Sequence, residues 1–185
     1  MLDNPEARPC PLTCKLACTL INRHRKFMPD QMPPPSPATI PFRKFMDIPF
    51  PFKGNMFHPA FSRQIAPEKI RPLLAEGEWV GYYSYFSMFG EDTRFDPPMT
   101  GIHFAVTENS GYGGFIVNSS GVDSVGAFFL NGHVDVYGVV EVTKSYTAGY
   151  VWHWRARMTP FGIMGCWGNR RDEGFVWIWK REWSV

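Results

Sequence analysis

The sequence predicts an all-β fold: an up-and-down antiparallel barrel of about eight strands that follows an irregular Pro/Phe-rich N-terminal arm. Two observations predict this division. Residues 73–185 repeat short runs rich in Val, Ile, Phe, Tyr, Trp or Thr, each bounded by Gly, Asn, Asp, Ser or Pro. Residues 1–72 instead hold 14 of the 17 prolines, 1 of the 17 glycines and none of the 7 tryptophans. We therefore expect an arm over 1–72 and a barrel over 73–185.

The arm combines proline, phenylalanine and positive charge. The run Pro33-Pro34-Pro35-Ser36-Pro37 favours extended backbone. The arm carries a net charge of +6, and the remainder carries −4. Because exposed phenylalanines promote aggregation, we expect residues 42–61 to form a strap that docks on the barrel. A tail that orders only on a partner is the alternative.

Eight strands are expected in the barrel, and eight is the number that closes a small barrel. Their predicted ranges are 77–86, 101–108, 112–118, 123–131, 133–143, 150–158, 161–167 and 174–182. Hairpin turns are expected at Asn109-Ser110-Gly111, Asn131-Gly132 and Thr159-Pro160, with Asn-Gly the strongest signal.

These turns fix a register in which side chains alternate between the two faces of the sheet. One predicted face is apolar: Val136, Val140, Val142, Trp152, Trp154, Ala156, Met158, Ile163 and Trp167. The opposite face carries His133, Asp135, Tyr137, Glu141, His153, Arg155 and Arg157. In the last strand, Phe175/Trp177/Trp179 and Val176/Ile178/Lys180 are both plausible inner sets. We expect the apolar face to line the lumen, since seven buried titratable groups would each need a partner.

Gly77-Glu78-Trp79 at the start of the first strand resembles the Gly-x-Trp signature of lipocalin-type (calycin) barrels. In that family a C-terminal cation covers the tryptophan, and Lys180 and Arg181 are available here. The run from Met158 to Gly168 and the closing Trp177–Trp183 are similar to uncharacterised lipocalin-like domains of fungal proteins. The resemblance implies that the lumen holds a hydrophobic small molecule. Some relatives are cofactor-independent isomerases or cyclases, so it also implies that no cofactor is required.

Aromatic side chains are the candidate ligand-binding residues, because aromatics supply apolar area and stacking faces. The candidates are Trp79, Tyr83, Phe104, Phe129, Trp152, Trp154 and Trp167. The alternative is that these rings simply fill the core of a small barrel. With a filled core, the protein would be a non-enzymatic interaction module whose arm docks on a partner.

The candidate catalytic residues are Glu141, His153, Arg155 and Tyr137. The predicted register places Glu141 opposite His153, as an acid–base pair requires. Arg155 or Arg157 would hold an oxyanion or an enolate. The alternative is a solvated outer face with cross-strand ion pairs.

Several other classes of function find no support in the sequence. The net charge of +2 does not indicate nucleic acid. Cys10, Cys14 and Cys18 are four apart, without the paired spacing of a metal site, so no metal is expected. Gly111-Tyr112-Gly113-Gly114 lies beside a hairpin and does not open a helix, as a phosphate loop would. No apolar run reaches the ~18–20 residues of a membrane span, and no signal peptide is evident, so a cytoplasmic location is expected.

Overall fold

The computed structural model describes residues 67–85, 98–108, 114–159, 162–169 and 173–184. The predicted strap, the three N-terminal cysteines, the turn at 109–111 and the adjoining glycines 111 and 113 lie outside the described residues. A helix at 67–75 crosses the predicted boundary at residue 72. The division into arm and barrel stays a prediction.

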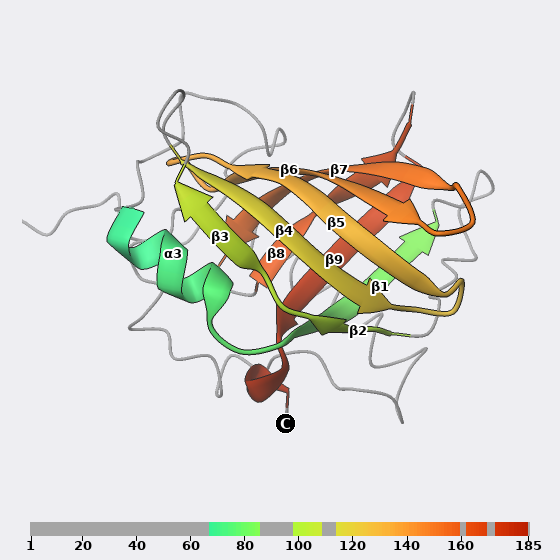
Figure 1. Ribbon diagram of the computed structural model, residues 1–185, viewed down its shortest axis with the longest axis horizontal. Helices are drawn as coiled ribbons and strands as arrows, with labels where there is room; N and C mark the ends of the chain where they lie inside the picture. The colour runs from blue at the N-terminus through green and yellow to red at the C-terminus, as the bar shows by residue number, and fades with distance from the viewer. Residues whose placement is uncertain (1–66, 86–97, 109–113, 160–161, 170–172, 185) are drawn as a thin grey trace, which may run out of the picture.

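Nine antiparallel strands form one sheet that closes into a barrel (Figure 1). The elements are α3 (Pro67–Ala75), β1 (Trp79–Tyr85), β2 (Met99–Ile102), β3 (Ala105–Glu108), β4 (Phe115–Val122), β5 (Ala127–Val134), β6 (Val139–Tyr146), β7 (Val151–Thr159), β8 (Gly162–Gly168), β9 (Gly174–Lys180) and η3 (Arg181–Trp183). The sheet order is β2-β1-β9-β8-β7-β6-β5-β4-β3, and pairing of Thr100 in β2 with Val122 in β4 closes a ring of eight strands. β3 is an extra strand along β4. The predicted up-and-down barrel is confirmed.

Two hairpin turns begin with aspartate and end with glycine. In Asp123-Ser-Val-Gly126 and Asp135-Val-Tyr-Gly138, the aspartate carboxylate accepts a backbone N–H two residues on, at 2.9 and 2.8 Å. The closing glycines have φ of 136° and 76°, where a Cβ would be strained. The sequence therefore encodes its turns through Asp-x-x-Gly.

The predicted turn at Asn131-Gly132 is wrong. Both residues lie inside β5, paired with Asn118 and Val117 of β4 and with β6 on the other side. Gly132 is needed for close strand approach instead, since a Cβ there would lie 2.1 Å from the carbonyl oxygen of Glu141. The predicted Glu141–His153 pair is also wrong, because the β6–β7 register differs by two residues: Glu141 lies opposite Arg155 on β7 and opposite His133 on β5.

The apolar face lines the lumen, as predicted. Val140, Val142, Trp154, Met158 and Trp167 are buried, whereas most of the titratable face is exposed. Three members of the predicted faces are misplaced, because residues 135, 136 and 137 lie in the 135–138 turn instead of a strand.

The last strand has two buried faces, which explains why its inner set was ambiguous. Ile178 pairs with Ile163, and Ile163 pairs with Met158 on the lumen side. The Val176/Ile178/Lys180 set is therefore the inner one. Trp177 and Trp179 face outward and are nevertheless 7% and 0% exposed. Alternation cannot reveal the inner face of a strand whose two faces are both apolar and buried.

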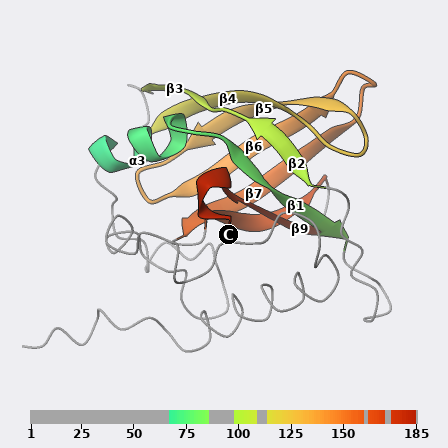
Figure 2. The ribbon, with the colours of Figure 1, turned by 90° about the horizontal axis from the view of Figure 1, so that it is seen from below.

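Buried side chains, Trp79 among them, fill the end of the barrel where β1 begins, which we call the closed end. Trp79 is 1% exposed and donates its indole N–H to the carbonyl of Leu74 at 3.0 Å. The ammonium of Lys180 lies 4.5 Å from the ring centroid of Trp79, so the predicted cation stacking is confirmed. The C-terminal turn η3, dark red in Figure 2, lies beside β1, where the Arg181 N–H donates to the Glu78 carbonyl at 2.8 Å.

Candidate functional site: an aromatic cavity at the open end

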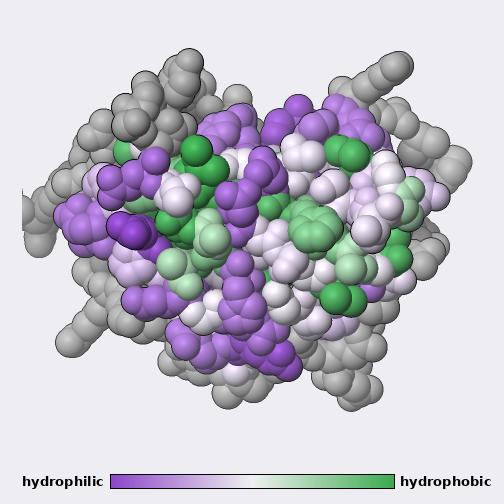
Figure 3. All heavy atoms as spheres, viewed as in Figure 1, coloured by the Kyte–Doolittle hydropathy of each residue, from purple (hydrophilic) through white to green (hydrophobic). Residues whose placement is uncertain are grey.

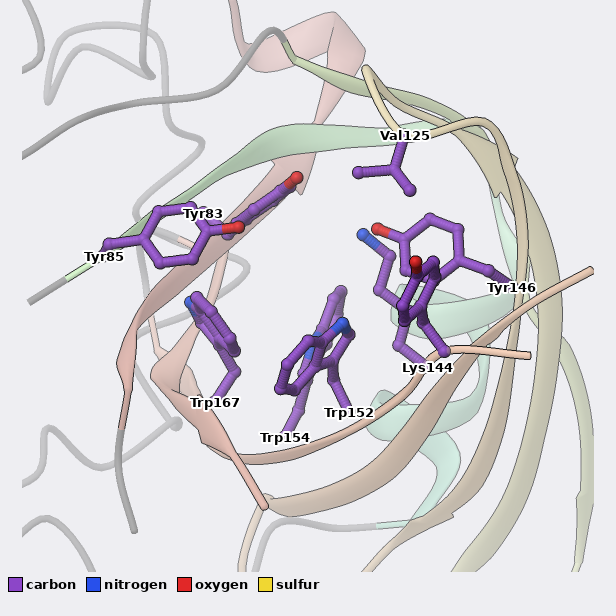
Figure 4. A pocket seen from close by; sticks show the side chains of 9 residues that line it. Tyr83, Tyr85, Val125, Lys144, Tyr146, Trp152, Trp154 and Trp167 are labelled. Carbon is purple, nitrogen blue, oxygen red and sulfur yellow. The ribbon is translucent and has the colours of Figure 1, made fainter. Parts of the chain in front are cut away.

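A cavity of about 320 Å³ lies at the opposite end of the barrel, which we call the open end (Figure 4). Strands β1, β6, β7 and β8 and the loops 123–126 and 147–150 supply its walls. The lining residues are Tyr83, Tyr85, Val125, Lys144, Tyr146, Tyr150, Trp152, Trp154 and Trp167. Seven of these nine side chains are aromatic, and the volume is at the lower end of the range for small-molecule sites.

One side of the cavity is a group of edge-on rings centred on Trp167. Its ring centroid lies 5.2 Å from that of Trp152, 5.8 Å from that of Tyr83 and 4.9 Å from that of Tyr85, all near perpendicular. Edge-to-face packing holds the rings in fixed orientations. The rings therefore build this wall of the cavity by packing against one another.

The other side of the cavity carries a buried cation. Lys144 is at an inward position of β6, after Val140 and Val142, and its side chain is 3% exposed. Its ammonium forms an ion pair with the carboxylate of Asp123, whose side chain is fully buried. The ammonium also lies 4.6 Å from the Tyr83 ring centroid and 4.2 Å from that of Phe128. Carboxylate and aromatic faces together compensate the buried charge.

Tyr146 completes this polar cluster. Its hydroxyl donates to the Asp123 carboxylate at 2.6 Å. Burial, and then the hydrogen bond and charge of Asp123, raise the pKa of Tyr146 far above its ordinary range. The hydroxyl therefore stays protonated over the physiological pH range, and the cluster of Lys144, Asp123 and Tyr146 has a net charge of zero.

Sequence reasoning missed Lys144 and Asp123. The period-two pattern of Val140 and Val142 places residue 144 inside the barrel, but the predicted strand ended at 143. An ionisable side chain at an inward strand position was the available signal. The predicted strand over 123–131 includes Asp123, although an aspartate three residues before a glycine indicates a turn.

Four of the seven predicted ligand-binding residues line the cavity: Tyr83, Trp152, Trp154 and Trp167. Trp79 and Phe104 instead pack against each other, with ring centroids 5.9 Å apart, within the core. Phe129 lies on the outer wall of β5 with 54% of its surface exposed, because its neighbours Phe128 and Leu130 take the inward positions. Its predicted place in the lumen is wrong.

The predicted catalytic residues lie outside the lumen. Glu141, His153 and Arg155 are exposed on the outer wall of β6 and β7, and Tyr137 is exposed in the 135–138 turn. The Glu141 carboxylate is 3.4 Å from His133 Nε2, and His153 Nδ1 is 3.2 Å from the hydroxyl of Thr143. A surface hollow of about 350 Å³ borders His133, Glu141, His153 and Arg155. The arrangement is that of solvated cross-strand pairs.

No family model, no curated protein and no solved structure matches this chain. The likeness to lipocalins therefore rests on the closed barrel and on the contact of Lys180 with Trp79 of the Gly-x-Trp sequence. Within the ranges that the structure describes, no three His, Cys, Asp or Glu side chains gather closely enough to hold a metal ion. Among the same residues, no helix is long and apolar enough to span a membrane.

Proposed function

We propose that this protein binds a hydrophobic small molecule in the open end of its barrel, as lipocalin-like barrels do. The observation that carries the proposal is the cavity of about 320 Å³ whose lining is mostly aromatic. A barrel packed solid, as the interaction-module alternative requires, would leave no such space. Apolar walls with a few polar groups are typical of small-molecule sites.

We infer that the ligand is uncharged and carries a hydrogen-bond acceptor. The Asp123 carboxylate already compensates Lys144, so a ligand carboxylate would add an uncompensated charge to an apolar site. A carbonyl or ether oxygen could instead lie near the Lys144 ammonium without the cost of burying a second, uncompensated charge. The aromatic rings would contact the remainder of the molecule.

Titration with paired fluorescent dyes tests both parts of the proposal. A neutral apolar dye should bind and quench or shift the tryptophan emission, because three indoles lie around the cavity. A carboxylate derivative of the same dye should bind about tenfold more weakly or worse, given the cost of burying an unpaired charge.

Two neighbouring residues of β7 provide the matched variants. Trp154 faces the lumen and His153 the solvent, so Trp154→Ala should weaken neutral-dye binding whereas His153→Ala leaves it unchanged. The opposite ranking would move the site to the outer wall, with Glu141, His153 and Arg155 as its chemistry. Absence of dye binding to the parent chain would favour the interaction module.

A cofactor-independent isomerase or cyclase is the second function we propose, favoured by the buried ammonium at the cavity wall. The α-proton of a bound ketone would pass to the Asp123 carboxylate through the Tyr146 hydroxyl, and the Lys144 ammonium would then compensate the charge of the enolate oxygen. The parent chain should then accelerate deuterium uptake at the α-carbon of an enolisable apolar ketone, and Lys144→Met should abolish the acceleration. If the parent has no effect on exchange while the dye binds, the protein is a binder.

A further inference from the structure

Five exposed apolar side chains lie on the β4–β5 and β6–β7 hairpins, on one side of the cavity mouth. We call them the collar: Val122, Val125, Phe129, Tyr150 and Val151, each between 42% and 59% exposed. Strand pairing places them at one end of the barrel, since Phe129 and Val151 both pair with Ser145 on β6. The 123–126 and 147–150 loops extend from the same end. Exposed apolar groups concentrated in one place mark a surface that contacts something other than water.

Among the described residues of β4–β7 and their two open-end loops, the collar lies in a part of the surface that has no exposed charge. Between residues 114 and 132 the one charged residue is Asp123, and between 142 and 152 it is Lys144. These two are buried against each other. The titratable side chains of the same wall, His133, Glu141 and Arg155, lie toward the closed end. In Figure 3, white and green atoms dominate the right side, over the open ends of β4 and β5, and purple dominates the lower centre and far left; a green patch also lies on the left, and some purple lies at the upper right.

The collar is continuous with the cavity. Val125 and Tyr150 belong to both, because they line the cavity and are also more than half exposed. Whatever covers the collar therefore covers the mouth. If an apolar surface covers the mouth, an apolar ligand that leaves the cavity passes directly into that surface without crossing water.

We propose that the collar docks on the surface of an electrically neutral lipid bilayer, with the cavity mouth facing the membrane. Tyrosine and phenylalanine favour the headgroup boundary, and interfacial binding grows with the apolar area buried. The absence of exposed lysine and arginine on the collar means that anionic lipid provides no attraction there. The docking goes beyond lumen binding, and it is measurable without a lumen ligand.

Flotation of the full chain with phosphatidylcholine vesicles at high salt tests the docking. High salt suppresses the contribution of the basic N-terminal segment, whose net charge is +6. The parent should float with the vesicles, and Phe129→Ser should weaken partitioning by about fivefold to tenfold, the share expected for half a phenylalanine side chain. Ile116→Ser is the matched control, since Ile116 is 40% exposed on the outer wall of β4, opposite His133 and away from the mouth. It should leave partitioning unchanged.

Three outcomes would overturn the proposal. The first is binding that requires phosphatidylserine and disappears at high salt, which would assign it to the basic segment. The second is equal weakening by Phe129→Ser and Ile116→Ser. The third is absence of vesicle binding together with a concentration-dependent dimer that Phe129→Ser dissociates, which would make a second copy the occupant of the collar. Neutral-dye titration of the Phe129→Ser chain should give the parent affinity, so a failed lumen site and a failed collar are distinguishable.

Discussion

Breaking the Lys144–Asp123 pair should destabilise the protein strongly and non-additively. In the parent chain, the Asp123 carboxylate accepts the backbone N–H groups of Val125 and Gly126 at 2.9 and 3.3 Å. In Asp123→Asn, the side-chain amide oxygen can still accept both. The turn therefore survives, and the change isolates the loss of charge opposite a cation that is 3% exposed. Leaving a buried charge uncompensated costs about 3–5 kcal/mol of the free energy of unfolding.

Lys144→Met should cost less, about 2–3 kcal/mol. The thioether fills the same space among Tyr83, Phe128 and Trp154 and packs well on aromatic rings. The remaining Asp123 carboxylate keeps three hydrogen-bond donors, from Tyr146 and two backbone amides. Removing the Lys144 ammonium therefore costs Asp123 only the modest penalty of one lost polar contact. The double variant should be less destabilised than the sum of the two singles, by on the order of 2 kcal/mol.

Guanidinium denaturation followed by tryptophan fluorescence measures these free energies. Arg155→Met is the control, an exposed cation on the adjacent strand whose loss should change stability by about 0.5 kcal/mol or less. Additive costs, or single variants as stable as Arg155→Met, would refute the buried-pair argument.

Three further predictions follow from the closed end and the outer wall. Trp79→Ala should cost about 3–5 kcal/mol of unfolding free energy, the loss of a core aromatic, and a chain as stable as the parent would contradict its role in filling the closed end. Burial lowers the pKa of Lys180 from 10.5 to about 8. Below pH 8 the Lys180 amine is protonated in both the folded and the unfolded chain. Above pH 8 the folded chain loses this proton first, so the unfolded chain binds more protons. Stability should therefore rise from pH 8 to pH 10, by up to about 2 kcal/mol, and this rise should be absent in Lys180→Met. Deleting residues 1–66 should lower the melting temperature or cause aggregation, because the sequence predicts that the strap docks on the barrel; an unchanged melting curve would contradict the docked strap.

The general architecture was predictable because its signals are local. Period-two alternation and frequent turn residues are properties of a few neighbouring residues, and they predicted the barrel and its apolar lumen. The contact of Trp79 with Lys180 was predictable from a family resemblance at the two ends of the barrel sequence, since β1 pairs with β9.

The candidate site was predictable only in its aromatic half. Trp152, Trp154 and Trp167 followed from alternation along β7 and β8. The predicted β6–β7 register was wrong by two residues, and a shift of two leaves every side chain on its own face. The polar cluster depends on long-range register, because Asp123 and Lys144 are 21 residues apart and meet only when β5 ends at Val134. The Asn131-Gly132 pair gave a wrong hairpin there, since its glycine serves close strand approach and its asparagine bonds Asn118 across the β4–β5 pair.

The indole N–H signals of the seven tryptophans in a two-dimensional NMR spectrum test the central claim most directly. Three of these residues line the cavity: Trp152, Trp154 and Trp167. The other four lie outside it: Trp79, Trp177, Trp179 and Trp183. Titration with a neutral apolar ligand should shift the first three signals and leave the other four in place. Shifts confined to Trp177 and Trp179, or no shift in any signal at saturating ligand, would contradict a ligand-holding lumen.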